Sequence, residues 1–159
     1  MVFREPTADD GREMFRIVKD SKVLDVNSSY SYLMWGKYFN KTSIVAERDH
    51  EIIGFITGFL QPNTPNTLFI WQIAVDSTHR GKGLASALIK NLLHQLKDHD
   101  VRFLEATVTP SNIPSSNLFK SIATSFEANC EISKCFLSEQ FPESSHEDEL
   151  TYRIGPLQI

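Results

Sequence analysis

The spacing of apolar residues divides the first part of the chain into two helices and a pair of strands. Residues 7–18 carry apolar side chains at helical intervals, behind a Thr-x-x-Asp pattern that is typical of a capping box. The aromatic-rich segment 28–39 predicts a second helix. Residues 42–62 predict a strand, a tight polar turn at residues 49–50 and a second strand. The chain therefore opens with helices and continues as a β-hairpin.

The pattern changes twice more before the chain ends. The stretch LFIWQIAVD, residues 68–76, is almost wholly apolar and predicts a central strand that is covered on both sides. Leucines four residues apart, from Leu84 to Leu96, predict a long helix. A strand at 102–109, a loop and helix at 110–126 and a final strand at 149–154 follow. This order predicts an α/β sandwich with a mixed sheet, in a single domain spanning residues 1–159.

Charge and composition exclude several classes of function. The net charge is −4, and the pI of about 5.7 argues against a basic nucleic-acid-binding surface. No apolar run reaches the ~20 residues of a membrane span, and the first residues do not resemble a secretory signal. Cys130 and Cys135 are the only cysteines, and without an export signal they are expected to be free thiols in the cytoplasm. No second ligand pair accompanies them, so we expect no metal site.

Two glycines stand directly before the long helix. Gly81 and Gly83 lie in the sequence Arg-Gly-Lys-Gly, after the apolar strand. The first amides of a helix are unpaired and carry partial positive charge, and glycines allow an anion to approach them closely. The spacing matches neither the dinucleotide-binding nor the phosphate-loop glycine pattern. Taken alone, the motif is equally compatible with a flexible strand-to-helix turn.

The surrounding stretch IAVDSTHRGKGLASALI resembles the acetyl-coenzyme A motif of the GNAT N-acetyltransferase superfamily. Arg80, Gly83 and Ala85 match its core, and Asn112 corresponds to the asparagine that follows the next strand. The resemblance implies a mostly antiparallel central sheet with helices on both faces, and acetyl-CoA as cosubstrate. It also implies that main-chain groups and Asn112 bind this cosubstrate. The implied cofactor-binding residues are Ile73, Ala74, Val75, Arg80, Gly81, Lys82, Gly83, Leu84, Ala85 and Asn112.

Further stretches resemble one branch of this superfamily. LDVNSSYSYL, PNTLFIWQIAVD, EATVTPSN and HEDEL are similar to segments of the members that acetylate L-2,4-diaminobutyrate in ectoine synthesis. The implied reaction transfers acetyl to the γ-amine of this diamino acid, and the resemblance also implies a homodimer. One residue departs from the superfamily pattern. Phe119 stands where many members carry the tyrosine that protonates the departing thiolate, and phenylalanine has no proton to donate.

Candidate catalytic and substrate-binding residues follow from the needs of this reaction. The attacking amine must lose a proton, the oxyanion needs a donor such as a main-chain N–H of an irregular strand at 71–75, and two substrate ammonium groups need acceptors. Tyr30 is the candidate for the missing acid, and His146 and Glu149 are candidates for the base or its relay. If residues 146–149 form a strand, Glu147 and Glu149 share a face. The candidate substrate-binding residues are Asp25, Asn27, Ser28, Trp71, Glu147 and Glu149.

Each of these residues also has a plain structural interpretation. Asp25 could be a helix-entry aspartate, Trp71 and Tyr30 could be packing residues, and residues 146–149 could be a solvated acidic loop. Two alternative functions also remain open at this point. The first is an acetyltransferase of the same fold that acts on another small amine, such as a polyamine or an amino sugar. The second, suggested by Phe119, is a module that senses acetyl-CoA without catalysis.

Overall fold

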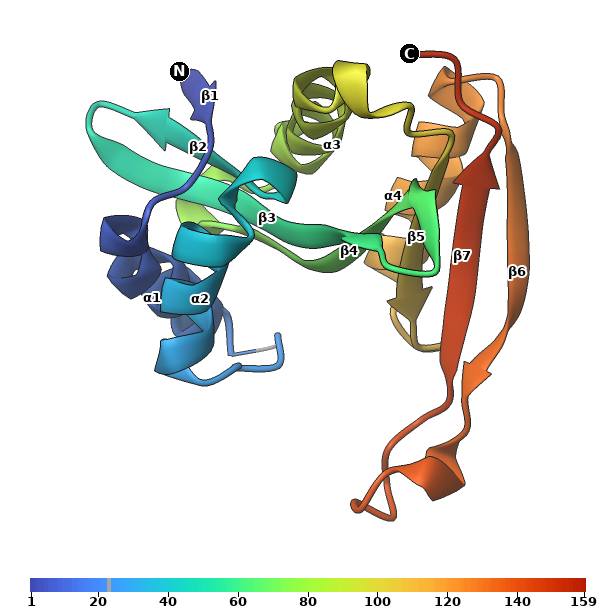
Figure 1. Cartoon of the computed structure of the whole chain (residues 1–159). Coiled ribbons are helices and arrows are strands. Elements are labelled where there is room, and N and C mark those ends of the chain that lie inside the picture. The colour runs from blue at the N-terminus through green and yellow to red at the C-terminus, as the bar shows by residue number, and fades with distance from the viewer. Residues whose placement is uncertain (23) are drawn as a thin grey trace. The chain divides into compact units, whose positions relative to one another are not determined.

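The computed structural model describes residues 1–22 and 24–159 (Figure 1). Within these residues, seven strands form one sheet in the order β1-β2-β3-β4-β5-β7-β6. The chain divides into two compact units, which are described separately. The first contains residues Met1–Leu60 and Ile70–Asp100, and the second contains Gln61–Phe69 and Val101–Ile159. The sheet is mixed and mostly antiparallel, which confirms the expected fold class.

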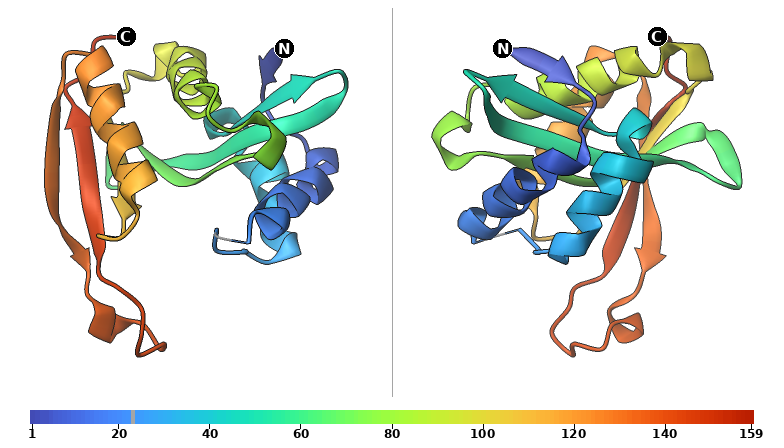
Figure 2. Two further views of the ribbon diagram at one scale, coloured as in Figure 1. Left: turned by 180° about the vertical axis from the view of Figure 1, so that it is seen from behind. Right: turned by 60° about the vertical axis from the view of Figure 1, so that its left-hand side comes forward.

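The first unit contains three helices and the amino-terminal strands. It contains β1 (Val2–Arg4), α1 (Gly11–Ser21), α2 (Ser29–Tyr38), β2 (Ile44–Arg48), most of β3 (Glu51–Gln61), the second half of β4 (Thr64–Val75) and α3 (Leu84–Gln95). Helices α1 and α2 lie on one side of the β2–β3 hairpin and α3 lies on the other (Figures 1 and 2). The two helices and the hairpin predicted from residues 7–62 are thereby confirmed.

The core of the first unit lies between this hairpin and its helices. Under α1 and α2 it consists of Met14, Ile17, Val18, Tyr32, Val45, Ile52, Phe55 and Ala74. On the α3 side, Leu88, Leu92 and Leu96 are fully buried, as their four-residue spacing predicts. Burying one such side chain contributes about 1.5–3 kcal/mol. Gly54 allows α3 to pack closely, because a Cβ there would lie only 3.2 Å from the side chains of Leu84 and Leu88.

Local polar contacts define where these elements begin and turn. The Asp10 carboxylate accepts a hydrogen bond from the Thr7 main-chain N–H at 2.7 Å, as a capping box requires. Arg4 donates to both oxygens of the same carboxylate. In the β2–β3 hairpin, Asp49 and His50 have φ values of 51° and 65°, which is the geometry of a tight two-residue turn.

The second unit consists of three strands with one α-helix packed against them. It contains β5 (Phe103–Val108), α4 (Ile113–Ser125), β6 (Asn129–Phe136) and β7 (Glu149–Gly155). β5 pairs in parallel with the first half of β4 and antiparallel with β7, which pairs antiparallel with β6. Helix α4 packs against one face of β6 and β7 (Figure 2). The Tyr152 ring of β7 lies 6.4 Å from the Phe119 ring of α4, so the apolar alternation of the last strand faces this helix.

Three details differ from the sequence-based expectations. Strand β1 is absent from them because three residues are too few to show a period. β4 begins at Thr64, before the apolar stretch. Its expected burial on both sides is wrong, because Trp71 is 54% exposed. An apolar residue can border a cavity rather than the core, and hydropathy does not distinguish the two.

Among the residues that the structure describes, no helix combines the length and apolarity needed to cross a bilayer. That residues 1–159 form a single functional domain stays a prediction.

Candidate active site

The glycine turn before α3 is open and has the backbone geometry that glycine favours. Gly81 and Gly83 have φ values of 73° and 76°, and, apart from the adjacent residues, no described atom lies within 4 Å of where a Cβ would stand on either one. Gly83 is the N-cap of α3, with its first turn beginning at Leu84. Arg80 and Lys82 are exposed beside it. Unpaired amides, partial positive charge, two cations and open space together suit an anionic group such as a diphosphate.

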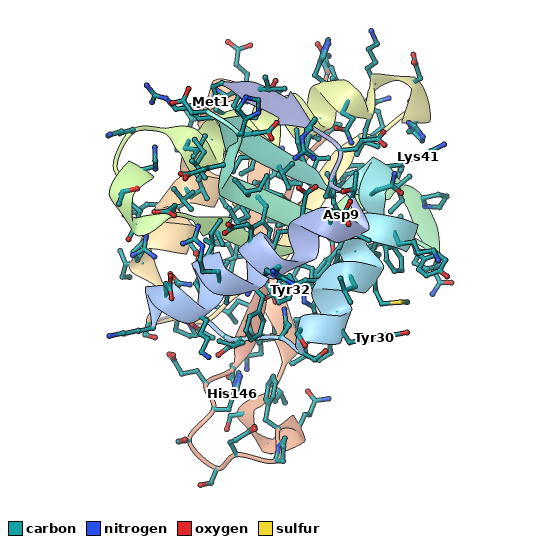
Figure 3. The ribbon with its side chains drawn as sticks, turned by 90° about the vertical axis from the view of Figure 1, so that its left-hand side faces the viewer. Met1, Asp9, Tyr30, Tyr32, Lys41 and His146 are labelled. Atoms are coloured by element: carbon teal, nitrogen blue, oxygen red, sulfur yellow. The ribbon has the colours of Figure 1, made fainter. Side chains whose placement is uncertain are left out.

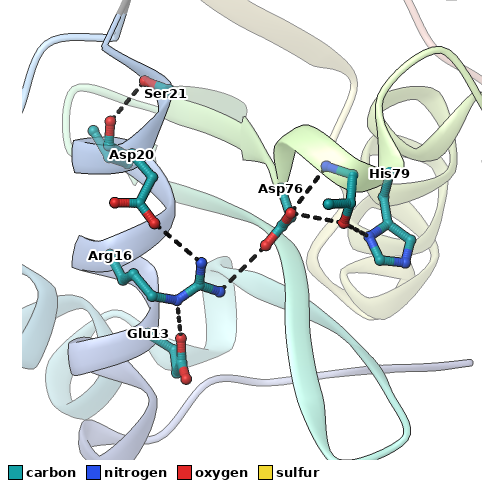
Figure 4. A network of polar contacts seen from close by, with 8 residues as sticks. Glu13, Arg16, Asp20, Ser21, Asp76 and His79 are labelled. Atoms are coloured by element: carbon teal, nitrogen blue, oxygen red, sulfur yellow. Dashed lines mark hydrogen bonds and ion pairs between the residues drawn. The ribbon is translucent and has the colours of Figure 1, made fainter.

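A polar network holds the chain where β4 leads into this turn (Figure 4). The Asp76 carboxylate accepts hydrogen bonds from the N–H and the hydroxyl of Thr78, at 3.0 and 2.9 Å. Arg16 of α1 donates to the other carboxylate oxygen at 3.2 Å. The Thr78 N–H is the main reason why the pKa of Asp76 lies below its usual value, and Arg16 lowers it further. The entrance to the turn is thus anchored to α1.

Some of the predicted cofactor-binding residues of β4 and α3 can contact a ligand only through their main-chain groups. The side chains of Ala74 and Leu84 are buried, so only their main-chain groups remain for binding. The Val75 carbonyl accepts from Arg80 Nε at 3.4 Å. Whether Ile73 and Ala85 contact a ligand stays a prediction, as does the pairing of this strand with an extended cosubstrate.

A cavity of about 350 Å³ lies beside α2 in the same unit. Four of the predicted site residues line it: the substrate-binding candidates Asn27, Ser28 and Trp71, and the candidate acid Tyr30. The complete lining consists of Asn27, Ser28, Tyr30, Ser31, Met34, Trp35, Phe39 and Trp71. The Trp71 ring lies 6.0 Å from the Trp35 ring. The structure therefore brings Asn27, Ser28 and Trp71, but not Asp25, to one cavity whose lining is half aromatic.

The segment before α2 is tied to β4 by one side chain, Gln72. Its Nε2 donates to the Asp25 main-chain carbonyl at 2.9 Å. Its Oε1 accepts from the Tyr32 hydroxyl at 2.8 Å and from Asn27 Nδ2 at 3.4 Å. Neither Gln72 nor Tyr32 was expected in the site. The sequence did contain a signal for Gln72, which is a polar residue within the apolar stretch QIAVD. A side-chain amide that is buried in a strand usually has a hydrogen-bond partner.

Trp71 and Gln72, neighbours on β4, both reach the region of α2. Trp71 contacts Trp35 of this helix, and Gln72 contacts Asn27 just before it. An irregularity of β4 that presents an N–H group at residues 71–75 stays a prediction.

The two tyrosines at the start of α2 differ sharply. Tyr30, the candidate acid, is 68% exposed, and its side chain extends away from the helix in Figure 3. Tyr32 is fully buried and points inward. Burial raises the pKa of Tyr32, so its hydroxyl keeps its proton at neutral pH. A proton-donating role for Tyr30 stays a prediction.

Asp25 and Ser28 occupy positions that also serve the local backbone. The Ser28 hydroxyl oxygen accepts from the Ser31 N–H at 3.2 Å and so caps α2. Asp25 is exposed, and only its main-chain carbonyl has a described hydrogen bond, to Gln72. Its carboxylate is thus available for a ligand. Substrate binding by either residue stays a prediction.

In the second unit, the loop before β7 shows that the predicted common strand face of Glu147 and Glu149 is wrong. Residues 146–148 precede β7, which begins at Glu149, so strand alternation does not place Glu147 and Glu149 on one face. Glu147 instead accepts hydrogen bonds from the Ser111 N–H and hydroxyl, at 3.1 and 2.5 Å. These contacts hold the loop, which cannot then continue the strand. The His146 ring stacks on Phe141 at 3.6 Å and is labelled in Figure 3.

Two further residues of the second unit bear on the predicted chemistry. Asn112 is the N-cap of α4, and its side-chain oxygen accepts from the Ser115 N–H at 3.2 Å. Cosubstrate binding by Asn112 stays a prediction. Phe119 is buried against Tyr152, whose hydroxyl is hydrogen-bonded to that of Ser116 at 2.8 Å. The position of the usual superfamily acid is therefore a packing position in this chain.

Comparison with known proteins agrees with this geometry. Residues 11–123 match the acetyltransferase (GNAT) family. The L-2,4-diaminobutyric acid acetyltransferase of Virgibacillus pantothenticus is 46% identical over 152 residues, covering 96% of each chain. That of Marinococcus halophilus is 47% identical over 156 residues, covering 98% of this chain and 90% of the relative.

A solved structure is similar along almost the whole length. Diaminobutyrate acetyltransferase EctA from Paenibacillus lautus, in complex with its substrate L-2,4-diaminobutyric acid and coenzyme A, has a TM-score of 0.93 and 42% identity. The match covers 99% of this chain and 96% of that one. Agreement of this extent in sequence and fold shows that the chain belongs to the GNAT acetyltransferase family.

Proposed function

We propose that the protein transfers the acetyl group of acetyl-CoA to the γ-amine of L-2,4-diaminobutyrate, giving γ-N-acetyl-diaminobutyrate for ectoine synthesis. The observation that carries this function is the similarity to EctA from Paenibacillus lautus, whose structure contains L-2,4-diaminobutyric acid and coenzyme A. Identity of 42% over nearly the whole chain makes a common substrate class the simplest conclusion. The aromatic cavity beside α2 suits a small amine, because aromatic faces attract ammonium groups.

The glycine turn fits the diphosphate of acetyl-CoA. The open space above Gly81 and Gly83 lets phosphate oxygens approach the main-chain amides at the start of α3. Arg80 and Lys82 add positive charge beside them. Acetyl-CoA supplies the acetyl group as a thioester, which is already activated toward amines. We assign Arg80, Gly81, Lys82, Gly83, Leu84 and Ala85 to the diphosphate, and Ile73, Ala74, Val75 and Asn112 to the remainder of the cosubstrate.

Residues of the chain perform the proton transfers. The γ-ammonium group loses a proton to His146 or Glu149, directly or through water, and the neutral amine attacks the thioester carbonyl. A main-chain N–H of β4 within residues 71–75 stabilises the oxyanion. When the C–S bond breaks, the Tyr30 hydroxyl donates a proton to the departing thiolate. The adduct nitrogen releases its second proton to water, and the Tyr30 phenolate regains a proton from water. Each such acid or base contributes about 10²–10⁴ in rate.

Acceptor groups bind the two substrate ammonium groups and orient the amino acid. We assign the Asp25 carboxylate and the Trp71 ring to this task in the first unit, with Asn27 and Ser28 as further polar contacts. Glu149 is assigned in the second unit, and Glu147 is retained as a weaker candidate because Ser111 already occupies both of its oxygens. We further propose a cytoplasmic homodimer that requires no metal, nucleic acid or membrane.

The function is tested by incubating the purified protein with acetyl-CoA and a panel of amines. The panel contains 2,4-diaminobutyrate, its shorter and longer diamino-acid homologues, a polyamine and an amino sugar. We expect a mass gain of one acetyl group on 2,4-diaminobutyrate, with the γ position identified by NMR. Acetylation of a different amine alone would contradict the assigned substrate. Binding of acetyl-CoA without turnover on any amine would support the sensing module instead. Light scattering tests the homodimer independently.

A further inference from the structure

We propose that Gln72 is a positioning residue that holds the acceptor-binding segment 25–28 against β4, and that the Tyr32 hydroxyl fixes the orientation of its amide. This inference deepens the proposed function and rests on it for the identity of the acceptor. Gln72 touches neither reacting group. It acts through Asp25 and Asn27, which it connects to the strand assigned to the acetyl end of the cosubstrate.

Segment 25–28 depends on such a contact because it has no regular secondary structure. α1 ends at Ser21, and α2 begins at Ser29. Main-chain groups in such a segment need partners outside a helix or sheet. Gln72 supplies one from 47 residues away, by donating to the Asp25 carbonyl at 2.9 Å. Through Asn27 Nδ2 it contacts the same segment a second time.

The direction of the hydrogen bonds determines which way the Gln72 amide faces. The Asp25 carbonyl can only accept a hydrogen bond, so Gln72 Nε2 faces it at 2.9 Å. The Tyr32 hydroxyl donates to the remaining amide atom, Oε1, at 2.8 Å, which holds the amide in this orientation. The buried tyrosine in the core of the first unit therefore contacts the loop both through Gln72 and by its own hydrogen bonds with Asn27.

The consequence for catalysis is geometric. Asp25 is assigned to a substrate ammonium group, and β4 is assigned to the thioester. The distance between them sets which amine of a diamino acid reaches the acetyl carbon, so loss of the Gln72 contact should weaken acceptor binding and relax the choice of chain length. Small misplacements of a bound reactant are costly in rate. Binding of coenzyme A at the glycine turn should be unaffected.

The decisive variant is Gln72→Met, which keeps the length of the side chain and removes its hydrogen bonds. We expect the KM for the acceptor to rise by about tenfold, as for the loss of one or two hydrogen bonds, and the KM for acetyl-CoA to stay within about twofold. Gln72→Glu keeps an acceptor for Tyr32 but loses the donor to Asp25, so it should show a similar change. Tyr32→Phe should raise the acceptor KM by about threefold, because the amide keeps its contact with Asp25.

Gln95→Met is the matched control. Gln95 Nε2 also donates to loop carbonyls, those of Lys41 and Ser43, at 2.9 and 3.1 Å. Its loss should lower the free energy of unfolding without changing the acceptor KM. If Gln72→Met leaves the acceptor KM unchanged, or changes both KM values in parallel as a general loss of stability would, the positioning role is refuted.

Hydrogen exchange keeps this inference separate from the substrate assignment. Amides of residues 25–28 should exchange faster in Gln72→Met than in the wild type, and at the wild-type rate in Gln95→Met. Unchanged exchange in Gln72→Met would overturn the inference whatever the substrate is. If the wild type acetylates another amine, the proposed substrate fails, while the same KM comparison with that amine still tests Gln72.

Discussion

The glycine turn and the acceptor-binding segment belong to the same unit but are built in opposite ways. Residues 80–85 present mainly main-chain amides, and their geometry follows from two glycines with positive φ and from the helix that begins beside them. Residues 25–28 present side chains, and their geometry follows from Gln72, a residue far away in the sequence. A site made of backbone depends on local sequence, whereas a site made of side chains depends on tertiary contacts.

This difference has a consequence for mutation. Substitution in the glycine turn should affect coenzyme binding through backbone strain and steric exclusion. Substitutions around the acceptor cavity should affect the acceptor or the chemical step, while coenzyme affinity persists. Three variants test this separation, and a fourth tests the polar network at the entrance to the glycine turn. Each has a control at a position of similar character.

The largest effect is expected at Tyr30. Tyr30→Phe removes the hydroxyl assigned to protonate the thiolate, so kcat should fall by about 10²-fold or more, with little change in coenzyme affinity. Steady-state kinetics with varied acceptor and varied acetyl-CoA measure this. Tyr38→Phe is the control, since Tyr38 is 62% exposed on the same helix and does not line the cavity. A wild-type kcat for Tyr30→Phe would remove Tyr30 as the candidate acid.

Gly83→Val tests the backbone site. A β-branched residue at a φ of 76° is strained, at a cost of about 1–3 kcal/mol, and its side chain would enter the space assigned to the phosphates. Coenzyme A affinity, measured by calorimetry, should fall by about tenfold to a hundredfold.

The control for Gly83→Val is Asp49→Val, because Asp49 has a φ of 51° in the distant β2–β3 turn. It introduces a comparable backbone strain, so it should reduce stability and leave coenzyme affinity intact. Equal affinity in wild type and Gly83→Val would argue that the diphosphate binds elsewhere.

Trp71→Ala tests the aromatic side of the acceptor cavity. Removal of the ring should raise the acceptor KM by about fivefold to thirtyfold, which corresponds to a cation–π contribution of about 1–2 kcal/mol. Coenzyme affinity should not change. Tyr38→Ala removes an exposed aromatic ring outside the cavity and should leave both constants unaltered. An acceptor KM that responds equally to the two substitutions would remove Trp71 from the site.

The smallest effect is expected from Asp76, at the entrance to the glycine turn. Asp76→Asn should lower the free energy of unfolding by about 1 kcal/mol at neutral pH, because the contacts of the carboxylate with Thr78 and Arg16 are weakened. The pKa of Asp76 is lowered in the folded state. Its contribution to stability is therefore complete above the unfolded pKa of about 4 and is lost as the pH falls below it.

Urea unfolding at pH 6 and at pH 3.5 measures this linkage. The difference in the free energy of unfolding between wild type and Asp76→Asn should be smaller at pH 3.5 than at pH 6. Asp20→Asn is the control, because Asp20 also contacts Arg16 but its side chain is 62% exposed. Its free energy of unfolding should be close to that of the wild type at both pH values. A difference for Asp76→Asn that is independent of pH would contradict the assigned ionisation.

Much of the architecture was predictable because it depends on local periodicity. The α3 leucines, the Asp49–His50 turn and the capping residues before α1 each act over a few positions, and the structure confirms them. Features that depend on distant partners were not predictable in this way. Alternation placed Glu147 and Glu149 on one strand face, but Ser111, which is 36 residues away in the sequence, holds Glu147 in a loop.

The sequence by itself determined the glycine turn, the helix behind it and the family resemblance, because conformational freedom at Gly81 and Gly83 and the four-residue leucine period are properties of neighbouring residues. Only the tertiary structure decided that Trp71 borders a cavity, that Phe119 is a packing residue and that Gln72 is hydrogen-bonded to segment 25–28. Burial and hydrogen bonding of these side chains arise from residues brought together by folding, and no local pattern records them.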